Sequence, residues 1–124
     1  MKTIKLIEIN KSLTPFDLFI CNSSFESRCL EIASRLDNKQ FKKVIICHFE
    51  ENYKEANDNL IKLKELFSDN YIVIELTKNS PLVNYDRLYD ELSRFEYNNV
   101  LLDISTFTRE MFLIIIQLFK QDCF

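Results

Sequence analysis

Hydroxyl, amide and guanidinium groups gather in two short stretches of this chain, each placed where an apolar run ends. The first stretch follows the run 17–21 and contains Asn22, Ser23, Ser24 and Arg28. Such groups bind phosphate and other anionic oxygens, above all beside the free amides that open a helix. The first stretch therefore predicts a polar, ligand-binding turn.

The second stretch contains more polar groups than the first and lies at the end of the apolar run 100–104. It contains Asp103, Ser105, Thr106, Thr108 and Arg109. Because an acid inside an apolar run is expected to be buried, it needs partners, which neighbouring amides, hydroxyls or the arginine can supply. We therefore expect these five side chains to bind a ligand.

Helix capping is the alternative explanation for both stretches. Ser23 or Ser24 can cap a following helix whose first turn holds Glu26. Ser105 or Thr106 can cap the last helix, with Glu110 completing a capping box. Capping alone does not account for the acid in the second apolar run.

Apolar runs and helical periods alternate along the whole chain, which is typical of βαβ units with a parallel sheet. We expect strands over 17–21, 43–49, 71–76 and 100–104, with a further edge strand over 3–9. Helices are expected over 25–36, 53–67, 83–95 and 109–121. The predicted fold is a three-layer, Rossmann-like α/β domain with a mainly parallel sheet of four to five strands.

Right-handed crossovers leave few strand orders for such a sheet. The commonest places the first and fourth strands side by side at the point where the order reverses, and open α/β sheets bind ligands there. Both polar stretches would then flank one crevice. Lys78, Asn79, Ser80 and Pro81 follow the third strand and are expected at its rim.

Composition narrows the classes of function. The 124 residues suit a single domain, 1–124, and a net charge of −3 argues against coating duplex nucleic acid. Glycine is absent, which excludes a glycine-rich phosphate loop, because such loops need glycine for the close approach of phosphate to the backbone. Asparagine is expected wherever the backbone must turn left-handed.

The remaining chemistry-bearing residues predict no metal site and no cofactor. Cys21, Cys29, Cys47 and Cys123 form no CxxC pair, and we expect them to be reduced and structural. His48 is the only histidine, and with Glu50 and Glu51 beside it we expect a solvated loop there. No signal peptide is visible and the apolar run 111–119 is too short to span a bilayer, so a cytoplasmic protein without membrane contact is expected.

The second stretch, Asp103-Ile-Ser-Thr-Phe-Thr-Arg109, resembles the Asp-x-Thr-Gly-Gly-Thr-Lys loop of the CRISPR-associated Rossmann-fold sensor domains. Asp103, Ser105, Thr108 and Arg109 match that loop, whereas Thr106 and Phe107 replace its glycines. The resemblance covers this motif and the outline of the fold. It implies binding of a cyclic oligoadenylate across a dimer and a role in antiviral defence signalling.

A second resemblance concerns the other end of the chain. The segment from Phe16 to Ser24 looks like the first box of TIR domains, some of which cleave NAD. The later glutamate-bearing segment of that family is absent here. A response-regulator receiver is also disfavoured, because no adjacent acids follow the first strand.

Three functions follow, and the first is favoured. The chain is expected to be a nucleotide-sensing domain without catalysis that binds a small anionic nucleotide. An enzyme that cleaves the glycosidic bond of a nucleotide, TIR-like or deoxyribosyltransferase-like, with Glu26 or Glu110 as its carboxylate, is the alternative. A non-catalytic interaction module is the third.

The last helix predicts self-association. Its segment 111–119 has Gln117 as its single polar residue, so it is apolar around nearly its whole circumference. Exposure of Phe112, Ile115, Ile116 or Phe119 would create the kind of patch that marks a protein interface. We therefore expect a homodimer through this helix.

Overall fold

The computed structural model describes residues 16–36, 41–49 and 54–120. Its sheet consists of four strands with the order β3-β2-β1-β4, and all of its pairings are parallel. The strands are β1 (Leu18–Ser23), β2 (Lys43–Phe49), β3 (Tyr71–Leu76) and β4 (Val100–Leu102). The expected edge strand over 3–9 lies outside the described residues.

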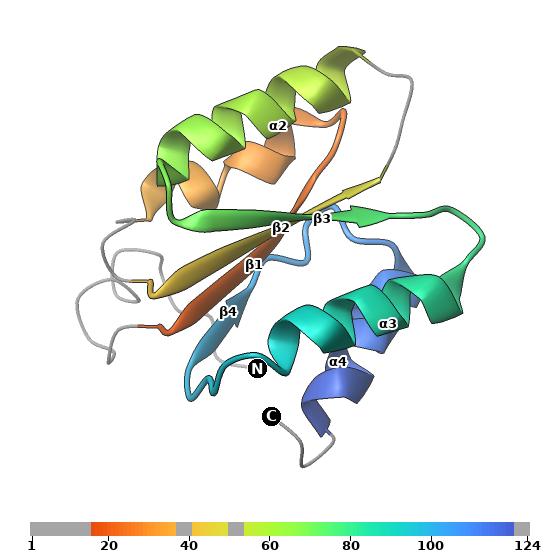
Figure 1. Ribbon diagram of the computed structural model, residues 1–124. Coiled ribbons are helices and arrows are strands. Elements are labelled where there is room, and N and C mark those ends of the chain that lie inside the picture. The colour runs from red at the N-terminus through yellow and green to blue at the C-terminus, as the bar shows by residue number, and fades with distance from the viewer. Residues whose placement is uncertain (1–15, 37–40, 50–53, 121–124) are drawn as a thin grey trace, which may run out of the picture.

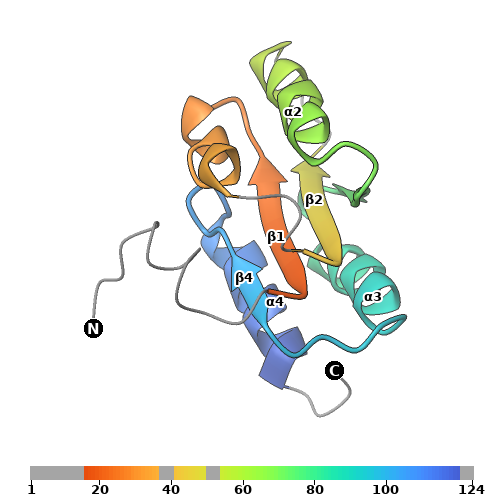
Figure 2. The ribbon, with the colours of Figure 1, turned by 90° about the vertical axis from the view of Figure 1, so that its left-hand side faces the viewer.

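Helices cover both faces of the sheet, which makes the three-layer α/β fold that the sequence predicts (Figure 1). One face carries α2 (Lys54–Phe67) and the short 3-10 helices η1 (Ser27–Leu30) and η2 (Ala33–Arg35). The other face carries α3 (Pro81–Leu92) and α4 (Arg109–Lys120). Figure 2 shows β1 between β2 and β4, with the two helical layers on opposite sides.

Alternate residues of β1 enter two separate cores. Leu18 and Ile20 pack with α3 and α4, whereas Phe19 and Cys21 pack with α2 and η2. All four are fully buried, and complete burial of a large apolar side chain stabilises a fold by about 1.5–3 kcal/mol. The continuous apolar character of the strand thus follows from burial on both faces.

Two expected helices differ from those observed. The helix expected over 25–36 is replaced by η1 and η2, which are held by i→i−3 bonds such as Cys29 N–H to Glu26 O at 3.2 Å. Serine and cysteine have modest helix propensity, so the segment forms short turns instead of one long helix. Phe25, the first residue of the expected helix, is 52% exposed, and Phe95, the last residue of the helix expected over 83–95, lies beyond the end of α3 and is 50% exposed.

The described residues contain no helix of the length and apolarity needed to cross a bilayer.

Candidate functional site

The carboxyl ends of β1 and β4 lie next to each other, as the predicted strand order requires. Ile20 pairs with Leu102, and the amide of Asp103 donates to the Ile20 carbonyl at 2.9 Å. The strand order reverses at this junction, because β2 and β3 follow on one side of β1 and β4 lies on the other. Both polar stretches therefore begin at one edge of the sheet.

Asn22 joins the two stretches directly. Its Nδ2 donates to the Thr106 carbonyl at 3.1 Å and to Thr106 Oγ1 at 3.2 Å. Thr106 Oγ1 in turn donates to the Asn22 carbonyl at 3.0 Å. These bonds bridge 84 positions of the sequence and attach the β4–α4 loop to the end of β1.

Asp103 is buried, with 2% of its surface exposed, and its Oδ1 accepts the Ser105 amide at 3.0 Å. Its partner is thus a neighbouring backbone amide, which is one of the three kinds of partner expected from the sequence. Two polar atoms of the two stretches are buried and find no hydrogen-bond partner within the described residues. They are Asn22 Oδ1 and Ser105 Oγ.

The cap of α4 is Thr108, so the prediction of Ser105 or Thr106 as the cap is wrong. Thr108 Oγ1 accepts the Met111 amide at 3.2 Å, three residues along, as an N-cap does. Glu110 is then the second residue of the helix and does not occupy the capping-box position. Arg109 is exposed at the first position of α4.

Ser23, Ser24 and Arg28 have partners of their own. Ser24 Oγ accepts the Glu26 amide at 3.2 Å, and the Ser24 carbonyl accepts Asn59 Nδ2 at 2.8 Å. Arg28 is exposed and its Nε lies 2.7 Å from Glu26 Oε2. Its charge is therefore balanced locally by Glu26.

The prediction of a solvated loop at His48 is also wrong. His48 belongs to β2 and is 5% exposed, and its Nδ1 lies 2.5 Å from Ser23 Oγ. The two residues are register partners on adjacent strands. Two charged neighbours in the sequence suggested exposure, whereas alternation along β2 places His48 on the α2 face with Val44 and Ile46.

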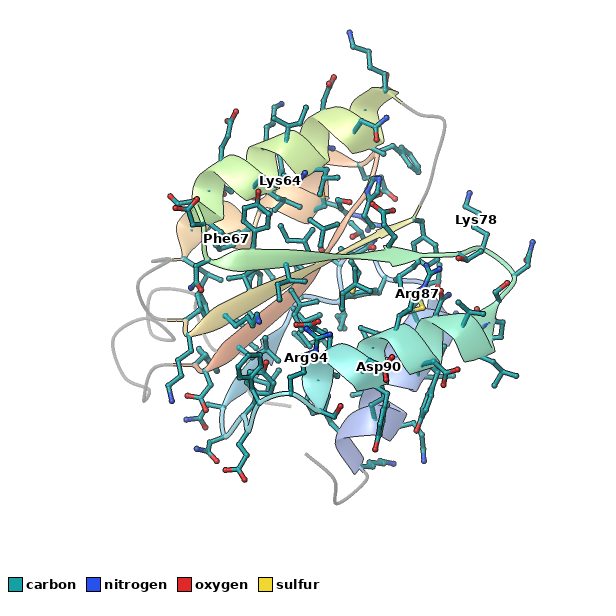
Figure 3. The ribbon with its side chains drawn as sticks, in the orientation of Figure 1. Lys64, Phe67, Lys78, Arg87, Asp90 and Arg94 are labelled. Atoms are coloured by element: carbon teal, nitrogen blue, oxygen red, sulfur yellow. The ribbon has the colours of Figure 1, made fainter. Side chains whose placement is uncertain are left out.

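A cavity of about 290 Å³ adjoins the β4–α4 loop at the same edge. It is lined by Phe49, Lys78, Asn79, Thr108 and Glu110. The N-termini of α3 and α4 therefore border this cavity, and a helix N-terminus favours a bound anion. Figure 3 places Lys78 on the turn between β3 and α3, where the sequence predicts the rim of the crevice.

A cavity of about 580 Å³ lies at the opposite edge, away from the polar stretches. Its lining includes Lys43, Phe95 and Tyr97. Lys43 Nζ is 3.4 Å from Glu91 Oε1 and 4.3 Å from the centre of the Phe95 ring. Its positive charge is therefore already paired with groups of the protein itself. Burial, with a smaller contribution from Glu91, raises the pKa of Tyr97.

The buried thiols are structural in character. Burial raises the pKa of Cys47 to about 12, and burial together with the charges of Cys47 and Asp103 raises the pKa of Cys21. Burial also raises the pKa of Cys29. In the part of the chain that the structure describes, no three His, Cys, Asp or Glu side chains are grouped as a metal site.

The fold and the junction of β1 with β4 define the class of this protein as a Rossmann-like α/β domain with a polar site at the reversal of strand order. No protein-family model matches the sequence, and a search of curated proteins finds no match.

Proposed function

We propose that this chain is a nucleotide-sensing domain that binds a small anionic nucleotide, such as a cyclic oligonucleotide, at the turns after β1 and β4. The observation that carries this proposal is the unused hydrogen-bonding capacity of Asn22 Oδ1 and Ser105 Oγ at the reversal of strand order. A buried polar atom without a partner is costly. Neither residue lines the neighbouring cavity, so the proposal requires the two turns to open around the ligand to satisfy these atoms.

Electrostatics at the neighbouring cavity supports an anionic ligand. Lys78 and the N-termini of α3 and α4 lie at this cavity and favour an anion, against the single carboxylate of its lining, Glu110. Arg109 is exposed directly after Thr108. The half-buried ring of Phe49 adds an apolar wall against which a base can pack. A role in antiviral defence signalling belongs to the same proposal and rests on the motif Asp103–Arg109.

The experiment is a ligand panel with two readouts. The protein is incubated with NAD, deoxynucleosides and cyclic oligonucleotides, and melting temperature and reaction products are followed together. A higher melting temperature without products supports a sensor, since a ligand that binds the folded state stabilises it. If no compound of the panel changes the melting temperature or yields a product, the proposal is contradicted and a non-catalytic interaction module is favoured.

Arg109→Ala sharpens this test. The exposed guanidinium is expected to contribute about 1.5–3 kcal/mol to binding of an anionic ligand, the range for charge-assisted hydrogen bonds. Lys120→Ala, at the opposite end of α4, removes the same charge and is expected to leave binding unchanged. Destabilised folding with intact binding in Arg109→Ala would show that the arginine serves the fold.

Cleavage of a nucleotide's glycosidic bond is the second candidate, and one observation favours Glu110 as its carboxylate. Glu110 lines the cavity of about 290 Å³, whereas Glu26 is paired with Arg28. If NAD or a deoxynucleoside is turned over, Glu110→Gln is expected to abolish turnover and Glu26→Gln to retain it. The reverse result would assign the carboxylate to Glu26.

Self-association through α4 completes the proposal. Leu113 is 64% exposed, and Phe112 and Ile116 are half-buried, so part of the apolar circumference does face solvent. A twofold interface there would bring two ligand sites together, because α4 begins at the site. Ile115, expected in the exposed set, is fully buried in the core and cannot contribute.

A further inference from the structure

Each of three loops at the carboxyl edge is attached to a buried asparagine of another element. Asn22 of β1 holds the β4–α4 loop, Asn59 of α2 holds the β1–η1 loop, and Asn84 of α3 holds the end of β3. Their exposed fractions are 5%, 6% and 1%. The chain thus uses buried amides to fasten the loops that surround the proposed site.

Asn84 binds both backbone groups of one residue. The Thr77 amide donates to Asn84 Oδ1 at 2.8 Å, and Asn84 Nδ2 donates to the Thr77 carbonyl at 2.9 Å. Lys78 and Asn79 follow directly and line the cavity. Asn79 has a φ of 62°, a left-handed conformation that asparagine adopts more readily than other residues with a side chain, as the sequence predicts.

Asn59 lies on the buried face of α2, which otherwise carries Ala56, Leu63 and Phe67. An amide among apolar side chains is unfavourable unless it is bonded. Asn59 Nδ2 donates to the Ser24 carbonyl at 2.8 Å and lies 3.5 Å from the Glu26 carbonyl. An apolar residue would fill the same core position, so the amide is explained by the loop that it holds.

We propose that Asn59 and Asn84 are positioning residues of the ligand site. They hold the β1–η1 and β3–α3 loops in the arrangement that binds ligand, and they do not contact the ligand. Binding sites need supporting groups that fix their geometry closely, and bonded buried amides are such groups. This inference rests on the proposed function.

The chain contains a matched control. Asn70 Nδ2 donates to the Phe41 carbonyl at 2.8 Å, the same kind of bond, but Asn70 is half-buried and lies near the amino-terminal edge of the sheet. Asn59→Leu, Asn84→Leu and Asn70→Leu each remove one such attachment. Asparagine-to-serine variants at the same positions repeat the comparison if a leucine variant does not fold.

The variants are compared by amide hydrogen exchange and by affinity for AMP, at a temperature where each is fully folded. Asn59→Leu and Asn84→Leu are expected to speed exchange in their own loops and to weaken AMP binding by about tenfold or more. Asn70→Leu is expected to leave AMP affinity unchanged.

Equal loss of AMP affinity in Asn70→Leu would overturn the positioning role, as would unchanged affinity in Asn59→Leu and Asn84→Leu. Loop exchange that stays as slow as in the unmodified protein would overturn it independently of any ligand. Failure of the unmodified protein to bind AMP or any member of the nucleotide panel is a different result, and it overturns the proposed function itself.

Discussion

Two hydroxyls of the β4–α4 loop have opposite energetic roles, although they are three residues apart. Thr108 Oγ1 accepts a hydrogen bond from the Met111 amide, which has no partner within the helix, whereas Ser105 Oγ is buried with no partner among the described residues. The first hydroxyl stabilises the fold, and the second is a buried polar group without a compensating hydrogen bond among the described residues, which costs free energy.

Alanine substitution separates these roles. Thr108→Ala is expected to lower the free energy of unfolding by about 1 kcal/mol, the usual value of an N-cap. Ser105→Ala is expected to leave it within about 0.5 kcal/mol or to raise it, since it removes an unsatisfied buried group. Urea denaturation measures both. A larger loss in Ser105→Ala would show that its hydroxyl is bonded in solution.

The buried thiol of Cys47 predicts a loss of stability at alkaline pH. Its pKa is raised from 9.0 to about 12, so between these values the unfolded chain carries a thiolate and the folded protein still holds the proton. The folded state then binds more protons, and its stability falls by about 1.4 kcal/mol per pH unit above pH 9.

Cys47→Ala isolates this contribution from other groups that titrate at high pH. The stability difference between the unmodified protein and the variant is expected to be constant from pH 6 to 8 and to shrink above pH 9. Urea denaturation across this range provides the measurement. A difference that stays constant to pH 11 would contradict the burial of the thiol.

At the scale of elements, the end of α2 shows what the absence of glycine costs. Ser68 follows the last residue of α2 with a φ of 53°, in the left-handed position that glycine usually occupies after a helix. The adjacent turn closes with the Asn70 amide donating to the Phe67 carbonyl at 3.0 Å. The fold thus accepts strain at this position to end the helix.

Ser68→Gly is therefore expected to stabilise the protein by about 0.5–1 kcal/mol. The left-handed penalty of about 1–2 kcal/mol is relieved, and about 0.5–1 kcal/mol is lost again to the greater freedom of glycine in the unfolded chain. Ser93→Gly is the control, because Ser93 follows α3 with a φ of −76° and should gain nothing. Equal gains in both variants would exclude relief of strain as the cause.

At the scale of the whole molecule, the proposed homodimer depends on the outer side of α4. Leu113→Lys is expected to give a folded monomer, because Leu113 is 64% exposed and a lysine there enters solvent. Ile115→Lys would instead place a charge in the core and unfold the protein. Ile61→Lys, on the opposite helical layer, is the control and should leave the dimer intact.

Sedimentation velocity at tens of micromolar protein tests whether the protein forms this dimer. The unmodified protein is expected to sediment as a dimer and Leu113→Lys as a monomer. A monomeric unmodified protein at that concentration would contradict self-association through α4.

The sequence by itself determined the class of fold and the edge of the sheet at which the two polar stretches meet. Strands and helices appear as local periodicities, such as the apolar run of β2 and the buried spacing of Ala56 and Leu63 in α2. The handedness of crossovers then restricts the strand order, so the placement of β1 beside β4 follows from general rules.

Only the tertiary structure decided which polar residue meets which partner. His48 is buried because it lies within β2, inside the strand bounds that the sequence predicts, and not in the loop that Glu50 and Glu51 suggested; its partner Ser23 is 25 positions away. Asn59 looked like an ordinary helix residue, because the loop that it holds becomes its neighbour only after the layers pack. Asn84 bonds Thr77, seven positions earlier, but its burial depends on packing of α3 against α4, where it also contacts Met111. Local patterns report periodicity, whereas burial and hydrogen-bond partners depend on contacts between distant segments, which no local pattern encodes.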